Sequence, residues 1–562
     1  MNTCAQCTQF FEITDADRVF FARLDVPEPM LCPPCRWQLH LAFRNEKTLY
    51  MRVCELCKKN TLSMYAPDAS YHVYCVRCWN SDGWEALEYG RDVRPTEPFF
   101  EHMNALMHVV PRMALFHVGE NENSQYANFL HKAFSAYLAF SSVETENIFY
   151  SRTVDRSRDC VDCLNCLDAE LLYECINCEN CYQSQYLERC VKVRESALCV
   201  DCHDCAYCFG CANLRHKQYY WFDKQLSKEE WQKKWLTWQQ GDAMAREQLI
   251  QEARVHHSRA IKKFASVVRC EDSTGEYLTN CKNCVNCFDG HESENCKDSI
   301  RLLGAKDAHS FSYGGLDSEL LYNSLASNYS HNIRFSMYSS SNRDCEYVDN
   351  CKQCADCFGC TGLSHKQYCI LNKQYSKEEF HRVRAELVAA MRERGEYGQF
   401  FPAALSPFGY NETLAHEYYP LTKEAALRTG FHWKDQLPGT YGSQTKSWDD
   451  VSPNIKDTDE SITKEVFACT ECTKNYKIIK QELLFYKRFS IPLPRRCFEC
   501  RLKARMFRRN PFQLWKRQCV CVEASHSNHA AGTQCSQIFE TAYSPDRQEK
   551  LYCEQCFHAV VI

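Results

Sequence analysis

Cysteine pairs with the spacing of metal ligands stand at both ends of the chain. The N-terminal pairs, each a CxxC, are Cys4/Cys7, Cys32/Cys35, Cys54/Cys57 and Cys75/Cys78. Two CxxC turns separated by a loop of this size bring four thiolates together, and Zn²⁺ prefers such a tetrahedral set. The spacing therefore predicts two structural zinc sites in an N-terminal module, residues 1–79.

The C-terminal end repeats this pattern. An offset of 465 carries the first five of these cysteines onto Cys469, Cys472, Cys497, Cys500 and Cys519. After a 13-residue insertion, an offset of 478 carries the other three onto Cys535, Cys553 and Cys556. The duplication predicts about four zinc ions, the last two in a C-terminal module, residues 466–562. Cys521 is an alternative to Cys519 as ligand, and it lies in the inserted loop with His526 and His529.

The segments CAQC…FFARLDVPEPMLCPPCR and CTEC…FYKRFSIPLPRRCFECR resemble the zinc-ribbon, treble-clef-like domain of bacterial proteins of unknown function. The layout of the whole chain resembles uncharacterised cysteine-rich proteins of candidate-phylum bacteria. The resemblance is specific at the two ends and loose in the middle. It implies zinc binding and no established activity.

The central cysteines follow a period of three. All 12 cysteines from Cys160 to Cys211 share one register, and none of its 24 positions from Ser142 onward is charged. A second run extends from Leu278 to Leu363 and slips by one residue at Gly314-Gly315. Neither an amphipathic helix nor a plain strand has this period. It predicts β-solenoids, and the recurrence of cysteine at an offset of 15 favours coils of about 15 residues or another multiple of three.

The two central runs are duplicates. CAYCFGCANLRHKQYYWFDKQLSKEEW, from Cys205, matches CADCFGCTGLSHKQYCILNKQYSKEEF, from Cys354, at an offset of 149. Both end in a capping box, Ser227…Glu230 and Ser376…Glu379, which predicts a helix that covers the open end of each solenoid. The predicted divisions are zinc ribbons 1–79, helical connector 80–119, solenoid 120–226, capping helix 227–264, solenoid 265–375, capping helix and linker 376–465, and basic zinc ribbons 466–562.

The central thiols have two interpretations. Runs of CxxCxxC are typical of iron–sulfur ligands, which favours a redox protein. The register also accepts Ser, Val and Leu, and residues 318–339 keep it with six serines and no cysteine. A metal site would lose its ligands if Ser, Val or Leu replaced the cysteines, whereas a ladder of small buried side chains would accept them. We therefore favour a structural role, with an iron–sulfur or thiol redox protein as the alternative.

A local basic segment distinguishes the C-terminal module from its N-terminal duplicate. Residues 495–517 contain nine cations and one Glu, with four aromatic rings between them, whereas residues 30–52 contain only four cations. Cations for phosphates and rings for bases favour a surface for RNA or single-stranded DNA, and the alternative is a solvated basic helix that links the two ribbons. The candidate residues are Arg495, Arg496, Arg501, Lys503, Arg505, Arg508, Arg509, Lys516 and Arg517.

Composition limits the remaining classes. The net charge of −5 over 562 residues excludes a global attraction to nucleic acid or membrane. We find no catalytic motif, signal peptide or membrane-spanning run, and we expect a cytoplasmic chain. The sequence thus predicts a mainly β, multidomain, non-enzymatic binding or scaffold protein with zinc ribbons at both ends. Its expected partners are RNA, the ribosome or another protein, and a carbohydrate-active β-helix is a third alternative.

Overall fold

The computed structural model describes residues 2–240, 242–526 and 529–562, and these form a mainly β structure. The chain divides into two compact units. Unit 1 contains Met1–Phe116, Ala265–Leu437 and Pro511–Leu514, and unit 2 contains His117–Phe264, Pro438–Asn510 and Trp515–Ile562. Each unit therefore joins one cysteine-rich end of the chain to a run of strands that is distant in the sequence. None of the described helices is long and apolar enough to cross a membrane.

In unit 2, residues 126–225 form a coil of parallel rungs that ends in one antiparallel strand, and we call it the first stack. Its strands are β8 (Tyr126–Phe149), β9 (Arg158–Val161), β10 (Glu170–Tyr173), β11 (Tyr182–Gln185), β12 (Ala206–Phe209), β13 (Gln218–Trp221) and β14 (Lys224–Gln225). Arg158 pairs with Glu170, and Glu170 pairs with Tyr182, so successive rungs are 12 residues apart. The coil is therefore 12 residues long instead of about 15, and it is the other kind of coil that the sequence allowed, a different multiple of three. Both numbers are multiples of three, and the cysteine recurrence alone does not distinguish them.

Each coil of the first stack turns at a corner every three residues. Asp159, Asp162, Asn165 and Asp168 have φ values of 49°, 56°, 54° and 50°, in the left-handed region. Asp and Asn tolerate this conformation better than other non-glycine residues. Four such corners close a 12-residue coil and direct the residue after each corner inward. The frequent Asp or Asn before an inward Cys is therefore a sequence signal of these corners, which the period of three alone does not reveal.

The interior of the first stack is dry and lined by small side chains. Its buried cluster runs from Ala127 to Cys211, so the inward register begins earlier than the Ser142 predicted from the sequence. Alanines stand in place of cysteines in that upstream part. The Cys178 thiol donates to the carbonyl of Ile176 at 3.3 Å, and the Ser184 hydroxyl donates to that of Tyr182 at 2.9 Å. Cys and Ser can therefore occupy the same inward positions, because each side chain fits the space and donates a hydrogen bond to a buried carbonyl.

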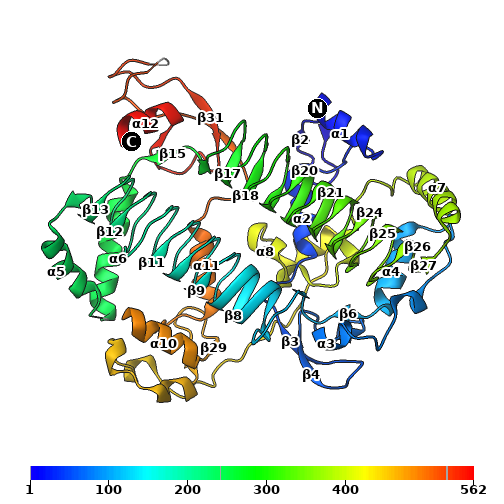
Figure 1. Cartoon of the computed structure of the whole chain (residues 1–562), viewed down its shortest axis with the longest axis horizontal. Coiled ribbons are helices and arrows are strands. Elements are labelled where there is room, and N and C mark those ends of the chain that lie inside the picture. The colour runs from blue at the N-terminus through cyan, green and yellow to red at the C-terminus, as the bar shows by residue number, and fades with distance from the viewer. Residues whose placement is uncertain (1, 241, 527–528) are drawn as a thin grey trace. The chain divides into compact units, whose positions relative to one another are not determined.

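Unit 1 contains a second stack of the same kind, residues 267–374, whose rungs lie in order in Figure 1. Its strands are β16 (Val267–Val268), β17 (Gly275–Thr279), β18 (Cys287–His291), β19 (Ile300–Leu303), β20 (Lys306–Gly314), β21 (Glu319–Asn328), β22 (His331–Arg334), β23 (Met337–Ser340), β24 (Arg343–Glu346), β25 (Ala355–Phe358), β26 (Gln367–Ile370) and β27 (Lys373–Gln374). Ile300 pairs with Ser312 at a spacing of 12, whereas Lys306 pairs with Glu319 at 13. The extra residue accommodates the predicted slip at Gly314-Gly315.

A helix begins directly after the last rung of each stack. Both predicted capping boxes are present, at the start of α5 (Lys228–Trp238) in unit 2 and of α7 (Lys377–Glu393) in unit 1. Trp238 of α5 packs on Phe209 with ring centroids 5.2 Å apart, and Phe380 of α7 packs on Tyr368 at 5.9 Å. These aromatic contacts place each helix against outward-facing rings of the last rungs.

The end modules are made of short hairpins and helices. In unit 1 these are β1 (Asn2–Thr3), β2 (Phe10–Phe11), α1 (Asp15–Arg23), α2 (Pro33–Ala42), β3 (Tyr50–Val53), β4 (Asn60–Ser63), β5 (Val73–Tyr74), α3 (Val76–Trp79), α4 (Phe99–Val109) and β6 (Arg112–Met113). In unit 2 they are β28 (Phe467–Ala468), β29 (Asn475–Tyr476), α10 (Lys480–Phe489), α11 (Phe498–Phe507), β30 (Trp515–Gln518), β31 (Ile538–Thr541), β32 (Leu551–Tyr552) and α12 (Glu554–Val561). Unit 2 also has β7 (His117–Val118), α6 (Ala243–Ser258) and β15 (Lys262–Lys263), and unit 1 has α8 (Leu414–Tyr418) and α9 (Lys423–Arg428).

Candidate metal centres

The predicted cysteine ligands converge in four groups. Within each group the four sulfur atoms lie within 4.8 Å of one another. The groups are Cys4/Cys7/Cys32/Cys35, Cys54/Cys57/Cys75/Cys78, Cys469/Cys472/Cys497/Cys500 and Cys519/Cys535/Cys553/Cys556. Four thiols at this separation surround a point at which a tetrahedral metal ion could bind.

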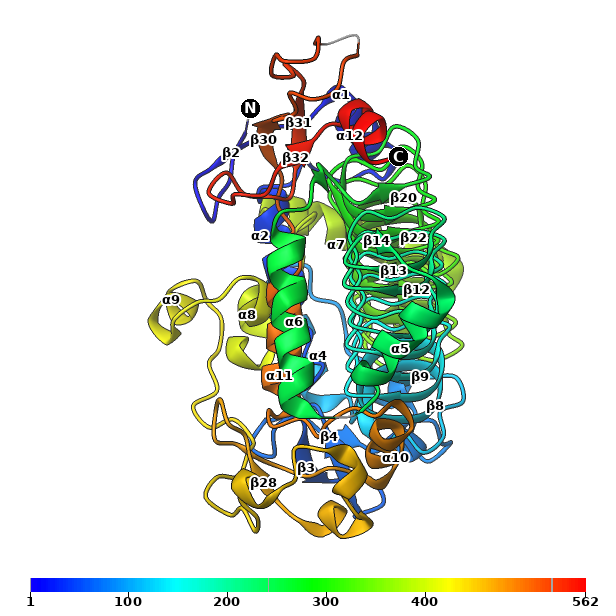
Figure 2. The same ribbon diagram turned by 90° about the vertical axis from the view of Figure 1, so that its left-hand side faces the viewer.

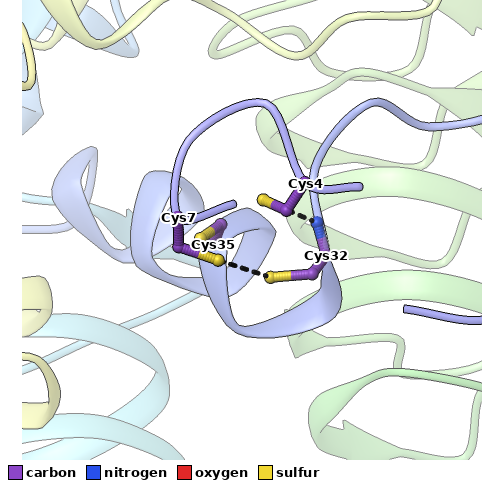
Figure 3. A group of neighbouring side chains, drawn as sticks. All are labelled: Cys4, Cys7, Cys32 and Cys35. Carbon is purple, nitrogen blue, oxygen red and sulfur yellow. Dashed lines mark hydrogen bonds between the residues drawn. The ribbon is translucent and has the colours of Figure 1, made fainter. Parts of the chain in front are cut away.

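Each group is built from a hairpin turn and a helix N-terminus. In the first, the turn after β1 supplies Cys4 and Cys7, while Cys32 caps α2 and Cys35 lies in its first turn (Figure 3). The Cys7 and Cys32 sulfurs are 3.6 Å apart, and the backbone N–H of Cys32 donates to the Cys4 sulfur at 3.3 Å. Thr8 adopts a φ of 60°, which closes the CxxC turn tightly.

The same N–H···S hydrogen bond recurs in every group and identifies the fourth ligand set. Cys75 donates to Cys54 at 3.2 Å, and Cys497 donates to Cys469 at 3.2 Å. In the last group the N–H of Cys553 donates to the sulfur of Cys519 at 3.3 Å. Cys519 therefore occupies the position equivalent to Cys4 and Cys54. Cys521 is buried beside this group but belongs to none of the converging sets among the described residues.

These backbone hydrogen bonds also favour the thiolate, the form that binds a metal. Burial by itself raises the pKa of Cys54, but the backbone N–H groups of Cys57 and Cys75 more than compensate and lower it to about 7. At Cys469, the duplicate of Cys4, burial is likewise outweighed by the N–H groups of Cys497 and Cys472, and the pKa is again about 7. At Cys519, the duplicate of Cys54, burial prevails and raises the pKa to about 11. In the groups of Cys54 and Cys469 the first cysteine therefore favours the thiolate that coordinates a metal ion, whereas burial keeps the Cys519 thiol protonated more strongly.

In unit 1 the first group is docked on the second stack through α2. Arg36, one residue after Cys35, pairs with Asp298 at 3.0 Å, and the Trp37 indole N–H donates to the Asp298 carbonyl at 2.7 Å. One turn further on, the His40 ring nitrogens lie 3.0 Å from Ser312 Oγ and 2.8 Å from Asn323 Oδ1. A metal ion in this group would therefore hold the N-terminus of a helix that is buried against the stack.

In unit 2 the equivalent helix, α11, packs on the first stack through more charged side chains than α2 uses in unit 1. Arg501 pairs with Asp162, and Arg505 lies 2.8 Å from Asp162 and 3.1 Å from Glu174. The offset of 465 relates His40 to Arg505, and the offset of 149 relates Asn323 to Glu174. The neutral His40–Asn323 pair of unit 1 therefore corresponds to the Arg505–Glu174 ion pair of unit 2. The helix residue and the stack residue have both changed between the two units.

This docking changes the interpretation of the basic C-terminal segment. Arg501, Arg505 and Arg509 have only 3%, 0% and 7% of their surface exposed. The expectation that these three residues contact nucleic acid is wrong for this structure, because their guanidinium groups face the first stack instead. Of the nine predicted cations, Arg495, Arg496, Lys503 and Lys516 are exposed, and Arg508 and Arg517 are half-buried.

The central cysteines do not converge as the end cysteines do. Among the residues that the structure describes, five groups of His, Cys or acidic side chains could hold a metal ion, and none includes a cysteine of either stack. The stack thiols instead donate to backbone carbonyls, as the Cys181 thiol does to Cys190 at 3.5 Å. All 40 cysteines are free thiols. The geometry gives no particular support to the iron–sulfur alternative.

Unit 2 also contains an open cleft of about 950 Å³ beside the metal-binding helix α11. It is lined by the first stack, by α6 and by α11, and Figure 2 shows both helices on the same side of that stack. Nine Arg or Lys side chains and four Glu side chains line it, an excess of five positive charges. Arg495, Arg496, Arg501 and Arg508 are the predicted cations among them.

The fold and these groups define a mainly β, cysteine-rich chain with several tetracysteine clusters that could bind metal ions. No known protein family matches the chain, and no curated protein matches it.

Proposed function

We propose that this chain is a zinc-stabilised binding protein whose cationic cleft takes single-stranded nucleic acid. In this proposal four structural zinc ions hold tandem zinc ribbons against two β-solenoids with 12-residue coils. The ribbons and solenoids provide a rigid frame, and the cleft of unit 2 is the binding surface. The exposed cations of that cleft, Arg254, Arg495 and Arg496, carry the proposal.

Three features of the cleft support a nucleic acid over a small ligand. Arg254, Arg495 and Arg496 are exposed, so a polyanion could reach them without displacing a buried ion pair. Phe507, at the end of α11, also lines the cleft and exposes 91% of its surface. An exposed ring beside several cations suits a base stacked next to its phosphates. The cleft is open to solvent, which suits a chain that passes through it more than an enclosed molecule.

The zinc identity rests on the donor chemistry. Four cysteines in each group supply soft thiolates in a closed set, with no position left for a substrate. Each group also lies at a helix N-terminus that is packed into its unit. This arrangement suits a structural ion better than a catalytic one.

The binding proposal is tested by fluorescence anisotropy of the full chain with a labelled oligouridine of about 20 nucleotides. We expect binding at low salt that weakens linearly in log[salt], with a slope of roughly −0.7 per phosphate contact. The variant Arg495→Glu/Arg496→Glu should abolish it without loss of zinc. The control Lys228→Glu/Lys233→Glu reverses two exposed charges of the same unit outside the cleft. Equal effects of the two variants, or no binding at low salt, would contradict the proposal.

A further inference from the structure

The fourth cysteine group differs from the other three because a second set of ligands overlaps it. His526, His529, Cys535 and Cys556 also place their ligand atoms within 4.8 Å of one another. Cys535 and Cys556 belong to both sets. The two histidines lie in the inserted loop that the N-terminal duplicate lacks, and this loop separates Cys519 from Cys535 where Cys54 and Cys57 form a CxxC.

The histidine rings are oriented for coordination. His526 Nε2 lies 2.9 Å from Cys556 Sγ and 3.6 Å from Cys535 Sγ, and His529 Nε2 lies 3.4 Å from Cys556 Sγ. His529 Nδ1 lies 2.9 Å from the carbonyl oxygen of Thr533. A carbonyl only accepts, so Nδ1 carries the proton and Nε2 presents its lone pair to the thiols. Metal-binding histidines are oriented in this way.

We infer that this group holds a binuclear zinc cluster, in which the thiolates of Cys535 and Cys556 bridge two ions. Cys519 and Cys553 complete the first ion, and His526 and His529 complete the second. Two tetrahedral ions need eight coordination positions, and four terminal ligands plus two bridging thiolates supply eight.

The charge of the cluster favours the second ion. Four thiolates around one Zn²⁺ carry a net charge of −2, whereas four thiolates and two neutral imidazoles around two Zn²⁺ carry none. All four cysteines of this group are buried, so an uncompensated charge would be costly there. The other three groups have no overlapping histidines among the described residues, and each should hold one ion.

Native mass spectrometry of the full chain, with zinc counted independently by elemental analysis, tests the inference. We expect five zinc ions per chain and four in the variant His526→Ala/His529→Ala. The control His558→Ala removes an exposed histidine of the same module outside the cluster and should retain five.

The bridging role makes a sharper prediction for matched cysteines. Cys556→Ser should lose two ions, whereas Cys78→Ser, at the equivalent position of the N-terminal module, should lose one. X-ray absorption spectra at the zinc edge should show zinc–zinc scattering for the wild type. The spectra of the double histidine variant should lack it.

The identity of the metal in this cluster rests on the proposed function. The possible zinc counts distinguish a failure of the cluster from a failure of that proposal. Four ions in the wild type would overturn the cluster and leave the four structural sites intact. A fifth ion that persists without His526 and His529 would also overturn it. A chain that holds no zinc would overturn both proposals. A wild-type count of four decides against the cluster even if a variant fails to fold.

Discussion

Arg501 and Asp162 form an ion pair in which the two side chains expose only 3% and 0% of their surface. Arg501 follows the last cysteine of a metal group directly, and Asp162 occupies a left-handed corner of the first stack. The pair thus connects a candidate metal centre to a coil that lies more than 300 residues away in the sequence. Its neighbours Arg505 and Glu174 extend the contact.

Removing Arg505 should destabilise unit 2. Arg505→Ala removes the buried cation that Asp162 and Glu174 share, and leaves them only Arg501 and Arg508. The loss should cost about 3 kcal/mol, the lower end of the penalty for breaking a buried pair. The double variant Arg505→His/Glu174→Asn reproduces the neutral His40–Asn323 contact of unit 1 and should recover part of that loss. Urea unfolding followed by circular dichroism measures both. Lys503→Glu, an exposed change on the same helix, should stay within about 0.5 kcal/mol of the wild type.

Loss of the first metal group should weaken the second stack. Cys32→Ser/Cys35→Ser should remove one zinc ion and unfold the start of α2, which bears Arg36 and His40. Hydrogen exchange should then accelerate around Asp298 and Asn323, where α2 docks, and stay unchanged in the first stack. The variant Cys497→Ser/Cys500→Ser should produce the reverse pattern. Full zinc retention in either variant would contradict the ligand assignment.

Inward stack positions should tolerate Ser and reject Asp. Cys178→Ser keeps a small donor for the Ile176 carbonyl and should change the stability by less than about 1 kcal/mol. Cys178→Asp buries a carboxylate without a counter-ion and should prevent the stack from folding. Thermal unfolding and expression in soluble form distinguish the two. Equal damage from both would instead indicate that Cys178 is a metal ligand.

Acid should destabilise unit 1 through its buried histidines. Burial lowers the pKa of His40 to about 3 and that of His309 to about 4, whereas an unfolded histidine titrates near about 6.5. Below pH 6.5 the unfolded state therefore binds more protons than the folded state. The stability is complete above that pH and falls toward pH 4, by up to about 1.4 kcal/mol per pH unit for each histidine.

The variant His40→Gln tests this pH dependence. Gln keeps a hydrogen-bond donor for Asn323 but has no proton to take up in this range, so the urea midpoint should depend less steeply on pH. Zinc content must be measured in parallel between pH 5 and 7, since acid also protonates the thiolates. An unchanged slope at constant zinc content would contradict the assignment.

The local patterns predicted much of this molecule. The CxxC spacing and the two offsets located all 16 cysteines that converge. The period of three located the inward residues, because a side chain that faces a dry interior cannot carry a charge. Ser227 and Ser376 located the helices that follow the stacks, since a capping box is a local signal.

Long-range contacts could not be predicted in this way. The coil length depends on which rungs pair, and a three-residue period allows 12 as readily as 15. The burial of Arg505 depends on Glu174, a residue 331 positions away. Without that partner, the cations of the C-terminal module resemble a surface for an external anion. The assignment of each end module to the distant stack also lies outside any local pattern.

The composition of the two units constrains the order in which a ribosome can complete them. The N-terminal module leaves the ribosome before the stack that α2 contacts, which begins at Val267. The first stack, made next, gains its docking helix only after residue 498. Each of these elements is therefore synthesised long before the segment on which it packs. Zinc bound early by the N-terminal cysteine groups would protect their thiols during that interval.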